Sequence, residues 1–265
     1  MGFRLFKTFI ATFTTMMRIL NLLFLSFILL NAKDISFEKI FQDLNINGTL
    51  VITNLAGDKF YIYNPKRAKT RFCPASTFKI PHTLIILNEN LIASKDATIE
   101  WDRIQREYEV WNRNQTLQTA IQTSCVWCYK QFSQKISKET YKDYLLKFDY
   151  GNKRVGQDKS SFWLNNDLKI SALEQIEFLK KLYSESLPIS KDKLHLAKEM
   201  LIIEKNEQFI LRAKSGWDGI VGWYVGYVET PKEVYFFVLN MDVEKEKLDL
   251  REEIIYRALK SKSIL

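Results

Sequence analysis

The chain has 265 residues, 46% of them hydrophobic, so it is long and apolar enough to bury a substantial core. Its formal net charge is +8, but lysine and glutamate are interspersed rather than grouped in blocks. That arrangement is typical of solvated faces and argues against nucleic acid as a partner.

The first 32 residues differ in kind from the rest. Residues 19–30 form a mostly apolar run that is too short to cross a bilayer and suits the core of a signal peptide, and Ala32 offers a small residue near a cleavage point. The basic residues before this run are Arg4, Lys7 and Arg18. We therefore expect residues 1–32 to be a signal peptide that is removed on export to the periplasm, leaving no stable membrane partner. An uncleaved or lipid-attached anchor is the alternative, and Met17 is an alternative start.

The elements expected next form a hairpin and a long helix. Apolar periodicity predicts a helix at 35–44, and alternating residues predict strands at 48–55 and 59–63. Ser76 is then expected to open a central helix that runs to about residue 87. Pro81 lies within its first two turns, where a missing backbone donor matters least.

The middle of the chain is predicted to alternate between loops and helices. Residues 94–111 are polar and irregular, and residues 150–166 form a loop with Trp163 as its apolar anchor. Ser171 and Glu174 have the spacing of a capping box at the start of a helix. The remaining helices are expected at 116–132, with an interruption near Ser124, at 138–148 and at 190–200.

The end of the chain is rich in β-forming residues. Strands are expected at 209–213, 220–228 and 234–241, followed by an amphipathic helix at 247–259. Strands at both ends with helices between them predict an α+β fold. One antiparallel sheet would be built from both chain ends and flanked by terminal helices. We expect a single domain at 33–265, with its sheet part at about 33–63 and 206–265 and a helical insertion at about 64–205.

Ser76 and Lys79 are the first candidates for chemistry. They lie three residues apart in a helical run, so both side chains are expected on one face. A serine needs a base nearby to become a nucleophile, and a lysine among apolar neighbours loses its proton readily. A Ser-x-x-Lys pattern alone is also compatible with a helix capped by Ser76 and an exposed Lys79. The choice depends on whether partner motifs occur.

Such motifs occur in order along the chain. They are Ser-Thr-Phe-Lys at 76–79, Ser-Cys-Val at 124–126, Tyr-Gly-Asn at 150–152, Phe-Trp-Leu at 162–164, Lys-Ser-Gly at 214–216 and Gly-Trp-Tyr-Val-Gly at 222–226. From about residue 48 to about 259 the chain resembles the class D serine β-lactamases, the oxacillinases. The resemblance implies a serine β-lactamase or penicillin-binding-protein-like fold. It also implies a hydrolase that opens β-lactam antibiotics through a serine acyl-enzyme and confers resistance to them.

The resemblance also implies catalytic roles. Ser76 would be the nucleophile, and Lys79, carboxylated by CO2, would be the general base for acylation and deacylation. Ser124 would relay a proton to the leaving nitrogen beside Lys214. The backbone N–H groups of Ser76 and Trp217 would form the oxyanion hole.

The resemblance assigns the remaining residues to the substrate and to the base. Ser215, Gly216, Trp217 and Arg251 would bind the substrate, with Arg251 on its carboxylate. An apolar pocket around the carboxylated lysine would be formed by Val126, Trp163 and Leu164. We expect no metal and no other cofactor, because His82 and His195 fall in no ligand pattern.

Two questions stay open at this point. Any one of the three pairings among Cys73, Cys125 and Cys128 would leave one thiol over. A bond from Cys73 to Cys125 or Cys128 would clamp two site segments together, although free buried thiols are favoured. A β-lactam sensor domain of the same fold, which is acylated without turnover, is the alternative function. A cell-wall transpeptidase is a third possibility.

Overall fold

The structure is a computed structural model, and it describes residues 34–265. The predicted signal peptide at 1–32 and the alternative start at Met17 therefore lie outside the described residues. Within residues 34–265, no helix is both long enough and apolar enough to span a membrane.

The strands form one antiparallel sheet in the order β2-β1-β6-β5-β4-β3, which confirms the predicted architecture. Its strands are β1 (Gly48–Asn54), β2 (Phe60–Tyr63), β3 (Ile202–Lys205), β4 (Ile210–Trp217), β5 (Val221–Glu229) and β6 (Val234–Asp242). Strand β3 was not predicted from the sequence, and it falls within the range expected to be helical, at about 64–205. This strand is a short edge strand that alternates between half-buried and exposed residues, so it lacks a continuous apolar signal.

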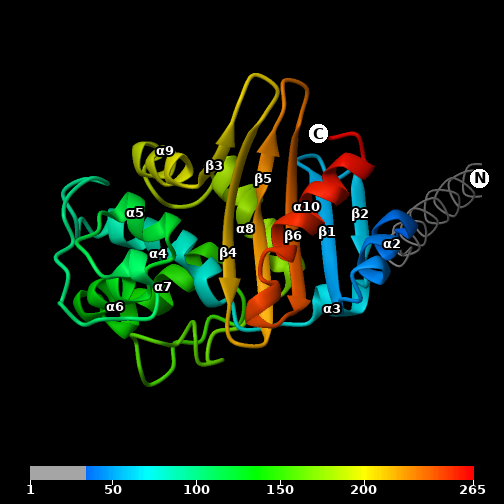
Figure 1. Ribbon diagram of the computed structural model, residues 1–265. Coiled ribbons are helices and arrows are strands. Elements are labelled where there is room, and N and C mark those ends of the chain that lie inside the picture. The colour runs from blue at the N-terminus through cyan, green and yellow to red at the C-terminus, as the bar shows by residue number, and fades with distance from the viewer. Residues whose placement is uncertain (1–33) are drawn as a thin grey trace, which may run out of the picture.

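Helices cover both faces of this sheet (Figure 1). Helices α2 (Ile35–Asp43) and α10 (Leu250–Ser261) pack on one face, and α8 (Ala172–Tyr183) packs on the other. Alternate residues of β1 serve the two cores, since Leu50 and Ile52 join the core under α2 and α10 whereas Val51 joins the other. Because both faces are buried, the central strands are apolar along almost their whole length.

The helical region lies beside β4 (Figure 1). Its elements are η1 (Ala75–Phe78), α4 (Lys79–Asn88), η2 (Glu109–Trp111), α5 (Leu117–Gln122), α6 (Val126–Lys135), α7 (Lys138–Phe148) and α9 (Lys191–Met200). Helix α3 (Pro65–Lys69) instead contacts β1 and α8. The expected helix start is corrected by one turn, because Ser76 lies in the 3₁₀ turn η1 and the α-helix begins at Lys79.

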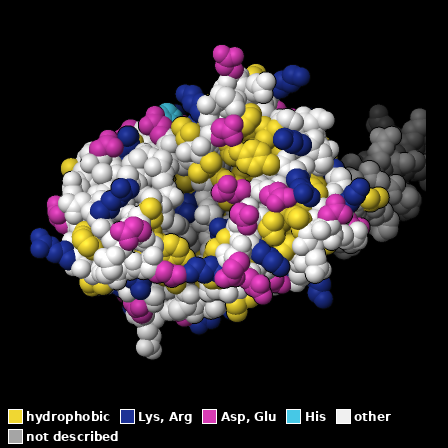
Figure 2. Space-filling model, viewed as in Figure 1, with side chains coloured by type: hydrophobic (Ala, Val, Ile, Leu, Met, Phe, Trp, Pro, Cys, Tyr) yellow, Lys and Arg dark blue, Asp and Glu magenta, His cyan; other side chains and the backbone are white. Residues whose placement is uncertain are grey.

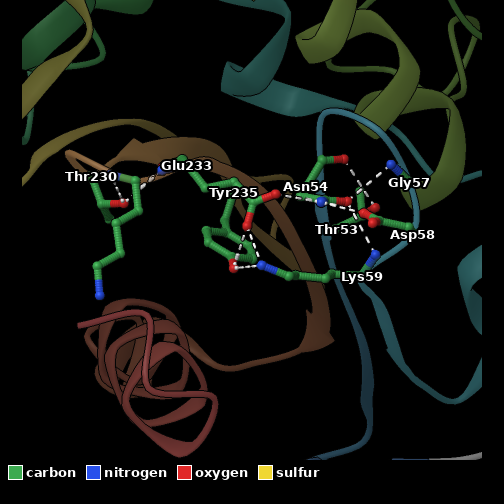
Figure 3. A network of polar contacts seen from close by, with 9 residues as sticks. Thr53, Asn54, Gly57, Asp58, Lys59, Thr230, Glu233 and Tyr235 are labelled. Carbon is green, nitrogen blue, oxygen red and sulfur yellow. Dashed lines mark hydrogen bonds and ion pairs between the residues drawn. The ribbon is translucent and has the colours of Figure 1, made fainter.

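A polar network joins two turns at one end of the sheet (Figure 3). The side-chain amide of Asn54 donates to both Asp58 and Glu233, and its oxygen accepts from the backbone of Lys59. Glu233 also accepts from the Tyr235 hydroxyl at 2.7 Å and pairs with the Lys59 ammonium. These contacts connect the β1–β2 hairpin to the β5–β6 hairpin, whose strand β6 is the neighbour of β1 in the sheet.

A short turn connects β4 to β5 at the opposite end of the sheet from the polar network. Trp217 ends β4 and Val221 begins β5, with Asp218 accepting from the backbone N–H groups of Ile220 and Val221. The turn is therefore tight, and β4 stays in register with β5 up to its last residue. Strand β4 forms one wall of the candidate site.

Candidate active site

A cavity of about 280 Å³ lies between the helical region and β4. Figure 2 shows this region as a hollow in which lysine or arginine side chains are visible. The predicted site residues that line the cavity are Ser76, Ser124, Val126, Ser215, Gly216, Trp217 and Arg251. Segments far apart in the chain are thus brought to one place by the sheet and the helical region together.

Ser76 lines this cavity and is in direct contact with Lys79, which does not line it. Nζ of Lys79 lies 2.7 Å from Oγ of Ser76. Lys79 is fully buried, whereas Ser76 keeps 8% of its surface exposed. Burial, together with the positive charge of Lys214, holds the pKa of Lys79 well below its usual value. A neutral amine beside an accessible hydroxyl is suited to accept the proton of that hydroxyl.

The turn that carries Ser76 packs directly against β4. A Cβ atom on Gly216 would lie 3.0 Å from the carbonyl oxygen of Pro74 and 3.1 Å from atoms of Thr77. Glycine at this position therefore allows close approach of the strand to the turn. Ala75, just before Ser76, has a left-handed φ of 47°, a strained conformation for an alanine.

Ser124 occupies the turn between α5 and α6 in a left-handed conformation, with φ of 58°. The backbone N–H of Cys125 bonds the carbonyl of Ala120 at 2.9 Å, and that of Ser124 bonds Ile121 at 3.3 Å. These two bonds form a Schellman motif in which Ser124 takes the position that glycine usually occupies. The motif aims its hydroxyl across the cavity at β4.

Lys214 is the partner of Ser124 on β4. Its Nζ donates to Oγ of Ser124 at 2.7 Å and to the carbonyl oxygen of Ser215 at 2.9 Å. Burial, with a smaller contribution from the positive charge of Arg251, lowers the pKa of Lys214 to about 7. This lysine can therefore change its charge near neutral pH.

Arg251 reaches the cavity from α10. Its guanidinium donates to the carbonyls of Leu248 at 2.7 Å and Gly216 at 2.9 Å. The stem of Arg251 passes over Gly222, where a Cβ atom would lie 2.5 Å from Cγ1 of Val243 and 3.2 Å from Cδ of the arginine. Glycine at position 222 therefore leaves room for both side chains, with Val243 the closer of the two. Burial lowers the pKa of Arg251 from its usual value.

Trp163 lies in the apolar core beside the start of α4, where its ring contacts Phe78 and His82. It is fully buried, and its ring stacks on Phe78 with centroids 5.6 Å apart. Its indole N–H has no hydrogen-bond partner among the described residues. Leu164 is partly buried against the same core, and Val126 faces the cavity. Nζ of Lys79 also lies 5.3 Å from the ring centroid of Tyr129.

The two histidines lie in different settings. His82 is buried, contacts the Tyr141 hydroxyl through Nε2 at 2.7 Å, and has its pKa lowered to about 3 by burial and by the nearby charge of Lys79. His195 lies on α9 and pairs with Glu185 away from the cavity. No group of His, Cys, Asp or Glu side chains in residues 34–265 is arranged to hold a metal ion.

The cysteines differ from the expectation of free thiols. Cys125 and Cys128 form a disulfide, and Cys73 remains a buried free thiol. The expected alternative, a bond from Cys73 to either of the others, is also wrong. The Sγ of Cys73 instead donates to the carbonyl of Trp163 at 3.1 Å. A disulfide across three residues became possible because α6 begins at Val126 and so brings residues 125 and 128 to one side.

Several cavity residues were missed by the sequence analysis. Tyr108, Trp111, Thr123 and Leu248 also line the cavity. Trp111 is held by its indole N–H, which donates to the carbonyl of Thr123 at 2.9 Å. Tyr108 and Trp111 lie in a segment read only as irregular, where aromatic residues in a polar loop were the available signal.

Comparison with known proteins gives consistent matches. Residues 40–260 match the penicillin binding protein transpeptidase domain. β-Lactamase OXA-20 of Pseudomonas aeruginosa is 40% identical over 227 residues, covering 84% of this chain and 85% of the relative. β-Lactamase OXA-48 of Klebsiella pneumoniae is 36% identical, with coverage of 87% and 89%. The crystal structure of the class D β-lactamase FUS-1 (OXA-85) from Fusobacterium nucleatum subsp. polymorphum superposes with a TM-score of 0.85 at 35% identity, covering 88% of this chain and all of that one.

Proposed function

Because this chain belongs to the class D β-lactamases, we propose that it opens the β-lactam ring through an acyl-enzyme on Ser76 and hydrolyses that ester, thereby conferring resistance. One observation carries the proposal. A fully buried lysine of lowered pKa, Lys79, lies 2.7 Å from the hydroxyl of Ser76, a residue that lines the cavity and keeps 8% of its surface exposed. The pair combines an accessible nucleophile with a base that water does not reach.

Acylation needs a proton acceptor on Ser76 and a stabilised oxyanion. Oγ of Ser76 attacks the carbonyl carbon while its proton passes to the basic group on Lys79. The backbone N–H groups of Ser76 and Trp217 are the proposed oxyanion donors, since both residues line the cavity. Gly216 supports this arrangement by letting β4 approach the turn of Ser76 closely.

We further propose that Lys79 carries a carboxyl group derived from CO2. The residues present fit such a group in two ways. The lowered pKa of Lys79 favours the neutral amine that reacts with CO2. Trp163, whose ring stacks on Phe78 next to Lys79 in the chain, has a buried indole N–H without a partner among the described residues. Reaction of the amine with CO2 releases one proton. A carbamate here would supply a carboxylate base for both half-reactions. Val126, Trp163 and Leu164 would keep its surroundings apolar.

The leaving nitrogen and the substrate carboxylate have separate proposed partners. Ser124 donates a proton to the nitrogen as the ring C–N bond breaks, and Lys214 supplies positive potential beside it. Ser215 and Arg251 would bind the carboxylate. The guanidinium has five N–H donors, and the described part of the chain engages two of them on carbonyls. The others remain suited to an anionic ligand.

The domain organisation and the export of the chain are also proposed. We propose that residues 33–265 form one catalytic domain and that residues 1–32 direct export to the periplasm. The disulfide supports export, because disulfides persist in oxidising compartments. The expected substrate is a β-lactam antibiotic.

Turnover of a chromogenic cephalosporin tests the function. We expect sustained hydrolysis that is faster with added bicarbonate, whereas a sensor domain would give one equivalent of product and then stop. Intact-mass spectra test the roles: Ser76→Ala should show no covalent adduct and Lys79→Ala should accumulate the acyl-enzyme. Lys39→Ala, at an exposed position on α2, is the control and should turn over like the wild type. Equal absence of adduct on the Ser76 and Lys79 variants would contradict the assignment.

A further inference from the structure

The disulfide closes the first turn of α6 at the point where the chain leaves Ser124. Cys125 is the N-cap residue of α6 and Cys128 is the third residue of that helix. The Sγ of Cys125 accepts from the backbone N–H of Cys128 at 3.3 Å. Sulfur is a weak acceptor, and strong N-caps normally use oxygen.

In two neighbouring helices of the same chain, a serine hydroxyl caps the helix where α6 has the sulfur of Cys125. At the start of α7, Oγ of Ser137 accepts from the backbone N–H of Thr140 at 3.0 Å. At the start of α8, Oγ of Ser171 accepts from that of Glu174 at 3.2 Å. In both helices an oxygen bridges the N-cap to the third residue. In α6 a covalent bond joins the same two positions, so it replaces the oxygen cap.

The turn that the disulfide closes lies next to residues that line the cavity or contact Lys79. Ser124 precedes the N-cap, Val126 is the first residue of α6 and lines the cavity, and the ring of Tyr129 lies 5.3 Å from Nζ of Lys79. The turn also positions Trp111. The indole N–H of Trp127 donates to the carbonyl of Trp111 at 3.0 Å, and that of Trp111 donates to Thr123 at 2.9 Å.

The same turn also contains backbone strain. Ser124 has a left-handed φ of 58°, a conformation that a non-glycine residue keeps only when its surroundings enforce it. Its neighbours on one side are the two Schellman hydrogen bonds to α5. On the other side, the constraint is the disulfide at the start of α6.

We propose that Cys125 and Cys128 are positioning residues for the reaction, and that their disulfide holds Ser124 and the first turn of α6 in the geometry needed for acylation. The proposal rests on the function proposed above. Opening the bond should therefore slow acylation while leaving the protein folded. A bond that closes so short a loop stabilises the fold less than one that closes a long loop, because the entropy of loop closure grows with loop length.

A dithiol can reduce the Cys125–Cys128 disulfide. A dithiol such as dithiothreitol breaks the sulfur–sulfur bond, supplies two electrons and two protons to give two thiols, and itself becomes a cyclic disulfide. Both cysteines are fully buried, so the reaction requires local opening of the turn. Incubation in dilute urea provides that opening, and mass spectrometry after alkylation in strong denaturant counts the thiols.

The test compares Cys125→Ala/Cys128→Ala with Cys125→Ser/Cys128→Ala, using a chromogenic cephalosporin in stopped flow. Active sites are first counted by covalent labelling, so that the acylation rate constant refers to active protein. We expect about a tenfold slower acylation for the double alanine variant, with a smaller loss for the serine variant, because its hydroxyl restores an oxygen cap. The substrate dissociation constant should change by less than about threefold, since Arg251, Lys214 and Ser215 lie on other elements.

Reduction of the wild type gives an independent result. Its acylation rate constant should fall when two additional thiols appear, and it should recover on reoxidation. The double alanine variant should not respond, and Cys73→Ser should respond like the wild type. An unchanged rate constant in fully reduced, folded wild type would overturn the proposal, even if the double alanine variant failed to fold. If the oxidised wild type were not acylated at all, the proposed function itself would fail instead.

Discussion

Lys79 and Lys214 each place Nζ 2.7 Å from a serine hydroxyl, and burial is the main cause that lowers the pKa of both. In the unfolded chain these lysines regain their ordinary pKa near 10.5. The unfolded state therefore binds more protons than the folded state over the interval between the two pKa values. For Lys214 this interval runs from about 7 to about 10.5, so its contribution to stability improves as the pH rises through it. At neutral pH these buried lysines therefore destabilise the folded state. The same burial gives Lys79 the neutral amine that can act as a base.

The pKa of Lys214 predicts the shape of the pH profile. Its protonated form supplies the positive potential for an anionic substrate, so kcat/KM should fall as the pH rises through about 7 in the free enzyme. The positive charge of Arg251 contributes to that low pKa. Arg251→Ala should therefore move the descending limb of kcat/KM to higher pH, while lowering kcat/KM overall. Steady-state kinetics from pH 5.5 to about 10 measures the shift.

A matched variant separates this effect from a general loss of charge. Arg257 lies on the same helix, is exposed and pairs with Glu253. Arg257→Ala should leave the limb where it is. A limb that stays in place in Arg251→Ala would remove Arg251 as a cause of the low pKa of Lys214.

At the scale of elements, the α5–α6 turn combines a structural need with a chemical one. The Schellman motif favours glycine at position 124, whereas proton transfer needs a hydroxyl there. Ser124→Gly and Ser124→Ala should both reduce kcat/KM by about a hundredfold, a typical contribution of a positioned acid or base. Their stabilities should differ, since glycine relieves a left-handed conformation that alanine retains. We expect Ser124→Gly to be more stable by about 1 kcal/mol in urea unfolding. Equal stability of the two variants would contradict a strained turn.

Elements with a local signal were predictable from sequence. Helix α7 was expected at 138–148 and has those bounds, because Ser137 caps it and an apolar stripe continues to Phe148. The capping box of Ser171 and Glu174 was also predicted and is present. In each case neighbours within four residues supply the cause, so no knowledge of the remaining fold was needed.

Elements with a distant cause were not predictable in the same way. The closeness of Gly216 to Pro74 and Thr77 depends on how β4 meets η1, which local periodicity does not encode. Pairing of Cys125 with Cys128 depends on where α6 begins, and the sequence analysis placed a single interrupted helix there. The resemblance of ordered motifs identified the candidate residues, but their contacts came from the packing of the helical region on the sheet.

At the scale of the whole molecule, Lys79 should link stability to dissolved CO2. Only the folded state holds the amine neutral in an apolar wall, so carboxylation would favour folding by mass action. A CO2 concentration tenfold above the dissociation constant would add about 1.4 kcal/mol. For a domain of this size that corresponds to a Tm increase of about 3 to 6 °C. Calorimetry at constant pH and ionic strength, with bicarbonate replacing chloride, measures it without any substrate.

Lys79→Met provides the decisive comparison, because it keeps the volume of the side chain but has no amine. It should lose hydrolysis and unfold with a free energy higher by about 1 to 2 kcal/mol at pH 7 in CO2-free buffer, since no buried lysine must give up its proton. Its Tm should not respond to bicarbonate, whereas the exposed-site variant Lys39→Met should respond like the wild type. If bicarbonate raised the Tm of Lys79→Met as much as that of the wild type, the increase would be a salt effect and not carboxylation. A wild type that did not respond at all would mean that Lys79 stays an unmodified amine, and the base for deacylation would have to be sought elsewhere in the cavity.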